Sequence, residues 1–248
     1  MLQARRFDVA VNLHGSGFVT NPLVCLVGAA RVGGFHRPGE WCPDPEAFLQ
    51  LADEAEPEVR RWLRLCTALG WPSQDEALEF PIRGPLPDLL ADLADRHFVV
   101  VHPGASVDAR RWPAERFAAV GDALAEEGAV VVLTGSEGER STTARVAALM
   151  RRPAIDVAGQ TSTDDLAHVV AAARVIVAND TGVAHLADAL RTPSVTIHVD
   201  STLERWAALD RSLHRPIRAG RADALDVAID ESLALYRAHR GTVRRDAA

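Results

Sequence analysis

Val175-Ile-Val-Ala-Asn-Asp-Thr-Gly-Val-Ala-His-Leu-Ala187 joins a run of apolar residues to a polar turn and a second apolar segment. The first four residues, bounded by polar neighbours, predict a short buried strand. A helix is expected from Gly182 to Leu190, and a further strand from Ser194 to Val199. A strand, a helix and a second strand in this order form the repeating unit of a parallel α/β sheet.

The same alternation extends to both sides of this run. The predicted strands are Phe98–Val101, Val130–Leu133 and Ile155–Val157. The predicted helices run from Pro113 to Gly128, from Gly138 to about Met150, from the capping box Ser162-x-x-Asp165 onward, and from Asp223 to Arg240. Strands that alternate with helices in this way predict a doubly wound parallel sheet.

The first third of the chain predicts a smaller unit. A strand is expected at Phe7–Leu13 and another at Arg31–Phe35. Apolar residues at helical spacing between Glu46 and Leu69 predict two helices that are divided at Pro57. The Pro-rich segment Pro72–Pro87 is the expected connection. The predicted division is therefore a domain at 1–84, a domain at 85–220, and a helix with a tail at 221–248.

Composition excludes several classes of protein. Of the 248 residues 48% are apolar and 25% charged, which is the balance of an ordinary globular protein. The 27 basic residues are all arginine and are outnumbered by 34 acidic residues, so the net charge is −7. This charge disfavours a nucleic acid or an anionic membrane as the main partner. Three cysteines without a C-x-x-C pair predict neither a zinc site nor a disulfide framework.

No apolar run approaches the ~18 residues of a membrane span, and Met1 to Arg6 lacks the apolar stretch of a signal peptide. A cytoplasmic location is therefore expected.

Three polar clusters each follow a predicted strand. They are Pro103–Trp112, Thr134–Glu137 and Asn179–His185. Open parallel sheets bind ligands at the carboxyl ends of their strands, so the clusters are expected to share one site.

The third cluster predicts a phosphate site at a helix N-terminus. Asp180 or Thr181 is expected to cap the helix, and Gly182 leaves room for a ligand to approach the free N–H groups. Thr181 and His185 are four residues apart and face the same side of the first turn. The alternative is a capped helix with a histidine whose hydrogen bonds are satisfied.

The other two clusters supply further candidates for a nucleotide site. Gly104, Ala105 and Ser106 can turn backbone N–H groups inward, and Arg110 or Arg111 provides positive charge. Glu137 is a candidate acceptor for ribose hydroxyls, as acidic residues are at other nucleotide sites. The alternatives are arginines on a solvated surface and an exposed acid at a helix start.

Absent motifs narrow the choice further. No G-x-G-x-x-G follows the first strand, and no P-loop, H-E-x-x-H, G-x-S-x-G or EF-hand spacing is present. The sequence also lacks an Asp-x-Asp motif that would hold a metal on a sugar diphosphate. A diphosphate leaving group would therefore be neutralised by arginine and the helix dipole, without a metal.

His102-Pro-Gly-Ala-Ser…Arg-Arg-Trp-Pro113, Thr134-Gly-Ser-Glu137 and Asn179-Asp-Thr-Gly…His-Leu-Ala187, in this order, resemble glycosyltransferase family 9, the ADP-heptose:lipopolysaccharide heptosyltransferases. The resemblance runs from about Arg6 to the end of the chain and is strongest between Val99 and Pro193. It implies an α/β fold of GT-B type, with two Rossmann-like parallel-sheet domains of which the N-terminal one is incomplete. The donor-site residues are then Gly104, Ala105, Ser106, Arg110, Arg111, Thr134, Gly135, Glu137, Thr161, Asp180, Thr181, Gly182 and His185.

The sequence departs from the family pattern at three places. Arg110 stands where the family usually has lysine. His198-Val-Asp-Ser-Thr202 replaces an aromatic-Gly-Pro loop. The segment that carries the family's acceptor-side catalytic Asp is expected upstream of Met1, so the base is unidentified and His14 is the candidate. The first half is then expected to expose apolar surface through which copies of the chain could associate.

The resemblance implies an inverting, metal-independent glycosyltransferase without a cofactor. Its donor would be a nucleotide-diphosphate sugar such as ADP-heptose, and its acceptor a glycan, lipid-linked or small-molecule hydroxyl. The chain is expected to bind donor but to transfer sugar poorly. The alternatives are an inactive nucleotide-sugar-binding paralogue and a GT-B nucleotide-sugar epimerase.

Overall fold

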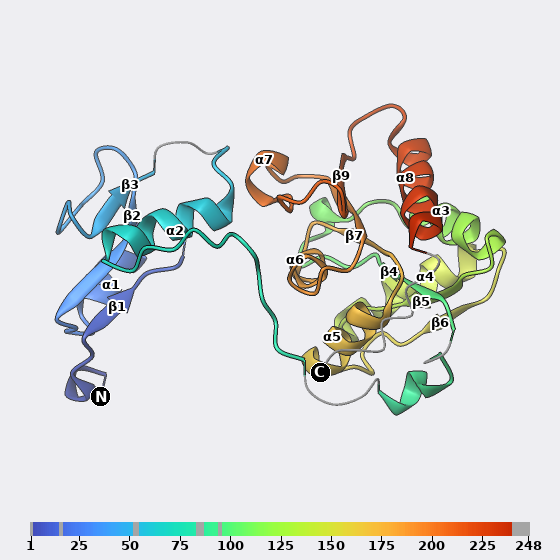
Figure 1. Cartoon of the computed structure of the whole chain (residues 1–248), viewed down its shortest axis with the longest axis horizontal. Helices are drawn as coiled ribbons and strands as arrows, with labels where there is room; N and C mark the ends of the chain where they lie inside the picture. The colour runs from blue at the N-terminus through green and yellow to red at the C-terminus, as the bar shows by residue number, and fades with distance from the viewer. Residues whose placement is uncertain (1, 15–16, 52–54, 83–86, 94–95, 240–248) are drawn as a thin grey trace. The chain divides into compact units, whose positions relative to one another are not determined.

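The computed structural model describes residues 2–14, 17–51, 55–82, 87–93 and 96–239 (Figure 1). The chain divides into two compact units, residues 1–76 and 77–248. The boundary expected between residues 84 and 85 lies outside the described residues. The C-terminal helix belongs to the second unit.

The second unit is built on a parallel sheet of six strands in the order β6-β5-β4-β7-β8-β9. The strands are β4 Phe98–His102, β5 Val130–Leu133, β6 Ala154–Asp156, β7 Ile176–Asn179, β8 Ser194–His198 and β9 His214–Arg218. The first five confirm the predicted strands. β9 is polar and contains Pro216, a residue that an edge strand tolerates. The strand order reverses between β4 and β7, and such a switch point is where open α/β sheets bind ligands.

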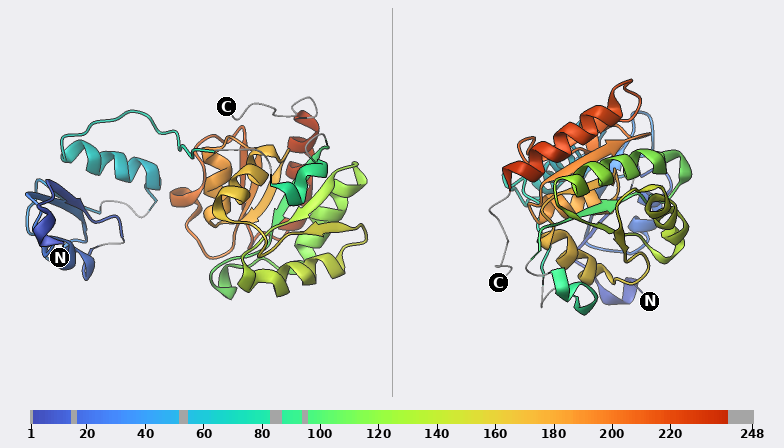
Figure 2. Two further views of the ribbon diagram at one scale, coloured as in Figure 1. Left: turned by 90° about the horizontal axis from the view of Figure 1, so that it is seen from below. Right: turned by 90° about the vertical axis from the view of Figure 1, so that its right-hand side faces the viewer.

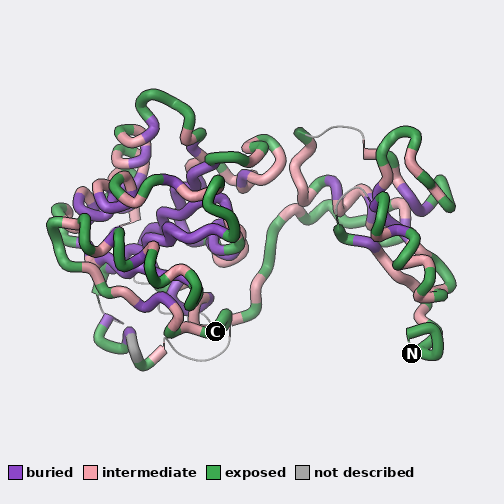
Figure 3. Tube along the Cα trace, turned by 180° about the vertical axis from the view of Figure 1, so that it is seen from behind, coloured by how far each residue is buried: buried purple, intermediate pink, exposed green. Residues whose placement is uncertain are grey.

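Helices cover both faces of this sheet (Figures 1 and 2). On one face lie α3 Ala114–Glu126, α4 Arg140–Leu149 and α8 Ala224–Ala238; on the other lie α5 Thr163–Ala172 and α6 Gly182–Ala189. Val99 and Val101 pack on the first face, and Val100 packs on the second. This alternation explains why the central strands are apolar up to their carboxyl ends and almost entirely buried (Figure 3).

The predicted helix boundaries hold for local reasons. Pro113 precedes α3, and Gly128 follows it with a φ of 91°. Ser162 and Asp165 form the expected capping box, in which the Asp165 N–H donates to Ser162 Oγ at 3.1 Å. Shorter helices complete the described elements: η1 Gln3–Arg5, η2 Asp88–Leu93, η3 Asp108–Arg110, η4 Glu137–Glu139 and α7 Leu203–Trp206.

The first unit contains three parallel strands in the order β1-β2-β3 and two α-helices in its described part. The elements are β1 Val9–Val11, α1 Thr20–Cys25, β2 Arg31–His36, β3 Phe48–Gln50 and α2 Glu58–Ala68. Phe35 and Phe48 pack with Leu65 and Leu69 in its core.

One of the two helices predicted between Glu46 and Leu69 is wrong. Phe48–Gln50 is a strand that pairs with β2, whereas the helix after Pro57 is confirmed. Gly33 permits the close approach of this segment, because an added Cβ there would lie only 3.0 Å from the Ala47 carbonyl oxygen just before β3. Strand pairing therefore overrides the local helical spacing.

Apolar side chains are exposed on the first unit, as expected. They gather in or beside α1, at Leu13, Phe18, Val19, Leu23 and Leu26. Within the described ranges, no helix is both long and apolar enough to cross a membrane.

Four histidines are buried in the second unit, and the pKa values of three of them, His102, His198 and His214, are shifted. Burial lowers the pKa of each ring, although a neighbouring carboxylate acts in the opposite direction in every case. Nδ1 of His102 lies 3.0 Å from the Thr134 hydroxyl, and Nδ1 of His214 lies 2.9 Å from the Ser194 hydroxyl. The three rings are therefore neutral in the folded protein at pH 7.

The second unit should lose stability as the pH falls below about 6.5, the ordinary pKa of histidine. Below that pH the unfolded chain binds protons that the folded chain excludes. Each ring then contributes a slope of up to about 1.4 kcal/mol per pH unit, until the pH reaches its lowered folded pKa. Urea unfolding monitored by hydrogen exchange of the second unit, at about pH 7.5 and about pH 5.5, measures the loss. His214→Asn should reduce the slope, and equal stability at the two pH values would contradict this assignment.

Candidate functional site

Two cavities lie at the carboxyl edge of the six-stranded sheet. Their volumes are about 620 Å³ and about 410 Å³. Arg110, Thr181, Gly182 and His185 line both of them. These residues follow β4 and β7, so the cavities meet at the switch point of the sheet. The structure thus brings the first and third polar clusters together.

The two cavities differ in chemistry. The larger one is walled mainly by apolar side chains, including Leu78, Phe80, Leu166, Val183 and Leu186. The smaller one is polar: Asp180, Asp200, Ser201, Thr202 and Trp206 complete its wall. A ligand with an apolar and a polar end would find a matching cavity for each end.

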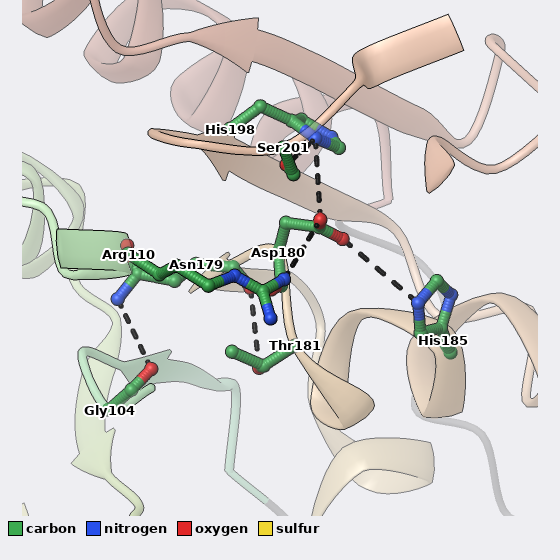
Figure 4. Close-up of polar contacts among 8 residues, drawn as sticks. All are labelled: Gly104, Arg110, Asn179, Asp180, Thr181, His185, His198 and Ser201. Atoms are coloured by element: carbon green, nitrogen blue, oxygen red, sulfur yellow. Dashed lines mark hydrogen bonds and ion pairs between the residues drawn. The ribbon is translucent and has the colours of Figure 1, made fainter. Parts of the chain in front are cut away.

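Arg110 and Asp180 form the polar centre between the cavities (Figure 4). Nη2 of Arg110 donates to the Asp180 carbonyl at 2.7 Å and lies 3.3 Å from its carboxylate oxygen Oδ2. The Asp180 side chain is only 5% exposed, whereas that of Arg110 is 34% exposed. The guanidinium therefore remains accessible to an anion.

The expectation that Asp180 or Thr181 caps α6 through its side chain is wrong. Thr181 occupies the N-cap position, but its hydroxyl donates to the Asn179 carbonyl at 3.3 Å. The Asp180 carboxylate turns toward Arg110 and lies 3.7 Å from Nδ1 of His198 and 4.0 Å from Nε2 of His185. These positive or polar groups draw it away from the helix terminus.

The helix terminus consequently keeps free donors. The N–H groups of Gly182 and Val183 donate no hydrogen bond within the described chain. No atom lies within 4 Å of a Cβ added to Gly182, so the space in front of the helix is open. Free N–H groups and the positive end of the helix dipole favour an anion there.

Glu137 of the second cluster lines neither cavity, whereas Glu139, two residues beyond that cluster, lines the larger one. Oε2 of Glu139 accepts hydrogen bonds from the N–H and hydroxyl of Ser136 at 2.7 and 2.8 Å. Burial alone would raise the pKa of Glu139, but these hydrogen bonds bring it below its usual value. Glu137 is exposed and pairs with Arg140 at 2.9 Å.

Gly104 allows Glu139 to reach the cavity, because an added Cβ at Gly104 would lie 2.2 Å from Glu139 Oε1. The sequence contains a pattern from which the position of the Glu139 side chain could have been predicted. Ser136 and Glu139 have the S-x-x-E spacing of a capping box, which turns the glutamate back toward the loop.

Asn179 holds the first cluster in place, a role that the sequence analysis did not assign. Its buried amide Nδ2 donates to the carbonyls of Pro103 and Gly104 at 2.9 and 3.2 Å. Its Oδ1 accepts from the Trp112 N–H at 3.0 Å. The side chain of the last residue of β7 thus fixes both ends of the loop that carries Arg110.

The remaining candidates have varied positions. Ala105 and Ser106 line the larger cavity. Arg111 lines neither cavity; its guanidinium donates to the Ala105 carbonyl and so stabilises the loop after β4. Thr134, Gly135 and Thr161 do not line either cavity; Thr134 is buried against His102. His14 is exposed and belongs to the first unit. Within the described residues, no group of three or more His, Cys, Asp or Glu could hold a metal ion.

The fold and the site define a Rossmann-like α/β protein in which a helix terminus with free N–H groups lies at the switch point of the sheet. The chain belongs to glycosyltransferase family 9 (heptosyltransferase), whose family model matches residues 1–224. The predicted family and the predicted α/β fold of GT-B type, with Rossmann-like parallel sheets, are confirmed.

Individual relatives agree with this assignment. Lipopolysaccharide heptosyltransferase 2 of Escherichia coli (strain K12) is 32% identical over 114 residues, which are 44% of this chain and 33% of that protein. The match therefore spans about a third of the relative's length.

Solved structures share the fold. The structure of E. coli ADP-heptose LPS heptosyltransferase II has a TM-score of 0.71 at 23% identity and covers 97% of this chain and 80% of its own. E. coli heptosyltransferase WaaC with ADP has a TM-score of 0.64 at 20% identity, covering 95% and 74%.

Proposed function

We propose that this chain binds a nucleotide-diphosphate sugar in its second unit and transfers the sugar, with inversion and without a metal, to an acceptor hydroxyl. The observation that carries the proposal is the meeting of an apolar and a polar cavity at Arg110 and the free terminus of α6. A nucleoside, a diphosphate and a sugar require an apolar, an anion-binding and a polar compartment in this order.

The larger cavity would hold the nucleoside, with its base against apolar side chains such as Phe80 and Leu166. Glu139 would accept hydrogen bonds from the ribose hydroxyls, because its carboxylate lines this cavity. The diphosphate would lie at Arg110 and the N–H groups of Gly182 and Val183. Similarity to a heptosyltransferase with ADP supports adenine as the base.

In the transfer step, the acceptor oxygen would attack the anomeric carbon as its proton passes to a base. The bond from that carbon to the diphosphate oxygen breaks, and its electron pair stays on the oxygen. Arg110 and the α6 terminus would stabilise this developing negative charge. Attack opposite to the leaving group inverts the anomeric centre. His14 remains the candidate base.

Similarity to lipopolysaccharide heptosyltransferase 2 supports a heptose as the donor sugar and a lipopolysaccharide as the lipid-linked acceptor. The second candidate function is nucleotide-sugar binding without turnover. It is favoured by one observation: the described residues of the second unit account for donor binding by themselves, whereas none of them is identified as a base for the acceptor. Product analysis with donor and acceptor separates the two, because a binding protein releases no product.

Calorimetric titration with ADP, first in chelator and then in Mg²⁺, tests the donor site. We expect binding in both buffers, with dissociation constants that agree within about threefold, which is under 1 kcal/mol. Binding that requires Mg²⁺ would overturn the metal-independent site, and no binding in either buffer would overturn the proposed function.

Glu139 and Glu137 provide a matched pair for the ribose contact. Glu139→Gln should lower the affinity for ADP about tenfold, which corresponds to one charged hydrogen bond of about 1.5 kcal/mol. The same variant should also lose the preference for ADP over 2′-deoxy-ADP, because the lost contact is to a ribose hydroxyl. Glu137→Gln should change neither value. If only Glu137→Gln lowered the affinity for ADP, Glu137 would be the residue that contacts the ribose, as the sequence predicted.

A further inference from the structure

The buried ring of His198, at the end of β8, has one nitrogen that faces two different partners (Figure 4). Its Nδ1 lies 2.9 Å from the Ser201 hydroxyl and 3.7 Å from Oδ2 of Asp180. The other nitrogen, Nε2, is buried and has no hydrogen-bond partner among the described residues. One nitrogen therefore has two possible partners and the other has none, which is rare for a buried polar side chain.

His214, a second buried histidine of the same sheet, shows the usual arrangement. Its Nδ1 lies 2.9 Å from the Ser194 hydroxyl, and its Nε2 lies 3.4 Å from Oδ1 of Asp188. Each nitrogen has its own partner, so a change in the charge of the ring requires no exchange of partners. At His198 the hydroxyl and the carboxylate share Nδ1, so the charge of the ring decides which of the two it binds.

Protonation would turn the His198 ring from the hydroxyl to the carboxylate. A neutral imidazole carries one N–H, whereas an imidazolium carries an N–H on both nitrogens. A proton that the ring takes from solvent therefore makes Nδ1 a donor, whichever tautomer the neutral ring has. A charged N–H forms a stronger hydrogen bond with the Asp180 carboxylate than with the Ser201 hydroxyl. The movement needed is small, because Nδ1 and Oδ2 already lie 3.7 Å apart.

The groups that face the His198 ring keep it neutral while the site holds no anion. Burial lowers the pKa of the ring most strongly, and the Asp180 carboxylate acts in the opposite direction. Arg211, Arg218 on β9 and His185 on α6 lower the pKa further. Arg218 is itself paired with a glutamate of α7. An additional negative charge near the ring would shift this balance toward the imidazolium.

A diphosphate at Arg110 would supply that charge. Nη2 of Arg110 lies 3.3 Å from Oδ2 of Asp180, the same oxygen that faces His198. When the guanidinium turns to the phosphate oxygens, the Asp180 carboxylate, which is only 5% exposed, loses part of its ion pair. A buried carboxylate without a cationic partner is unfavourable. Protonation of His198 gives the same oxygen a second cationic partner.

We infer that His198 is a positioning residue of the donor site, which takes up a proton from solvent when a diphosphate binds Arg110. The protonated ring exchanges Ser201 for Asp180 as the partner of Nδ1 and so holds the Asp180 carboxylate in place. This inference rests on the proposed function, which supplies the diphosphate. His198 and Ser201 both belong to the segment that replaces the family's aromatic-Gly-Pro loop, so the exchange is not a property expected of the family.

Donor binding and protonation of His198 then favour each other, because coupling between two sites is reciprocal. The probe that tests this is ADP-glucose, whose esterified phosphates do not titrate near neutral pH, whereas the terminal phosphate of ADP does. Calorimetric titrations at about pH 6.5, in two buffers of different ionisation enthalpy, give the number of protons taken up. The wild-type protein should take up about half a proton or more per ADP-glucose, and its affinity should rise about fivefold from about pH 8 to about pH 6.5.

Three variants identify the ring that takes up the proton. His198→Asn keeps a polar side chain beside Ser201 but cannot be protonated, so it should lose most of the uptake and of the pH dependence. His185→Asn removes the other imidazole near Asp180 and should keep most of the uptake, whatever its affinity. His214→Asn, the matched buried histidine away from the cavities, should behave as wild type. Thermal melting verifies folding, and His198→Gln replaces His198→Asn if the latter is unfolded.

A purely structural role of His198 would change affinity or melting temperature without changing the number of protons. If ADP-glucose binds the wild-type protein without proton uptake, the inference is overturned and the proposed function stands. The same holds if the His198 variants take up as many protons as the wild type, or if only His185→Asn loses the uptake. If the wild-type protein binds neither ADP nor ADP-glucose, the inference and the proposed function are both overturned.

Discussion

Replacing Arg110 by methionine should weaken the binding of ADP about 100-fold, because two charged hydrogen bonds to the diphosphate are each worth about 1.5 kcal/mol. Arg110 lines both cavities, and a third of its side chain is exposed toward them. Methionine keeps an unbranched apolar stem of similar shape and removes the guanidinium group with its charge and donors. Arg110→Lys should bind ADP within about tenfold of the wild-type affinity, because lysine keeps the positive charge. The remaining decrease is expected because lysine lacks the forked donors of a guanidinium group.

Arg110→Met also leaves the Asp180 carboxylate buried without its ion pair, which would destabilise the site by itself. The double variant Arg110→Met, Asp180→Asn removes that charge and separates the two effects. If stability returns while the affinity for ADP stays low, the guanidinium binds the diphosphate directly. Arg140→Met removes an exposed arginine that pairs with Glu137 and should bind ADP normally. Tight ADP binding by Arg110→Met would contradict the assignment of the anion site.

The sequence predicted the second unit well because its signals are local. Each central strand is a short apolar run with a turn on either side. In β4 and β7 this pattern lies within the segment itself and can be identified without knowing which strands pair with it. The capping box at Ser162 and Asp165 is likewise a contact between residues three apart. Such features depend little on the rest of the fold.

The errors arise where distant residues decide. β3 forms because β2 presents glycines beside it, and β9 forms because β8 leaves an edge for it to pair with. Neither partner is visible from the spacing of the segment itself. In addition, β9 is polar and lacks the apolar alternation on which a strand prediction depends.

The candidate site shows the same division. The sequence placed the clusters at one edge, because strand ends of a parallel sheet share a side. It could not determine which way a side chain turns once several partners compete for it. Asp180 turns to Arg110 instead of capping α6, and Glu139, two residues beyond the predicted Glu137, turns toward Gly104 and the cavity.

Asn179 is the position at which fold and site depend most strongly on one side chain. Asn179→Ala would leave the N–H of Trp112 and the carbonyls of Pro103 and Gly104 without their partner, and all three residues are buried. Each buried backbone group that loses its hydrogen bond costs about 1–3 kcal/mol, so the loss for the three groups should be about 3–9 kcal/mol. This is a large part of the 5–15 kcal/mol that is typical of a whole domain.

Hydrogen exchange of amides in β4 and β7 under increasing urea measures the loss in the second unit alone. Thr192→Val is the control: it removes one buried hydrogen bond, to the Val170 carbonyl, away from the cavities. It should cost about 1 kcal/mol and leave the affinity for ADP unchanged. Asn179→Ala should weaken ADP binding even where the unit remains folded, because the loop that carries Arg110 loses its anchor. If both variants lose stability and neither loses affinity, Asn179 supports the fold and does not position the site.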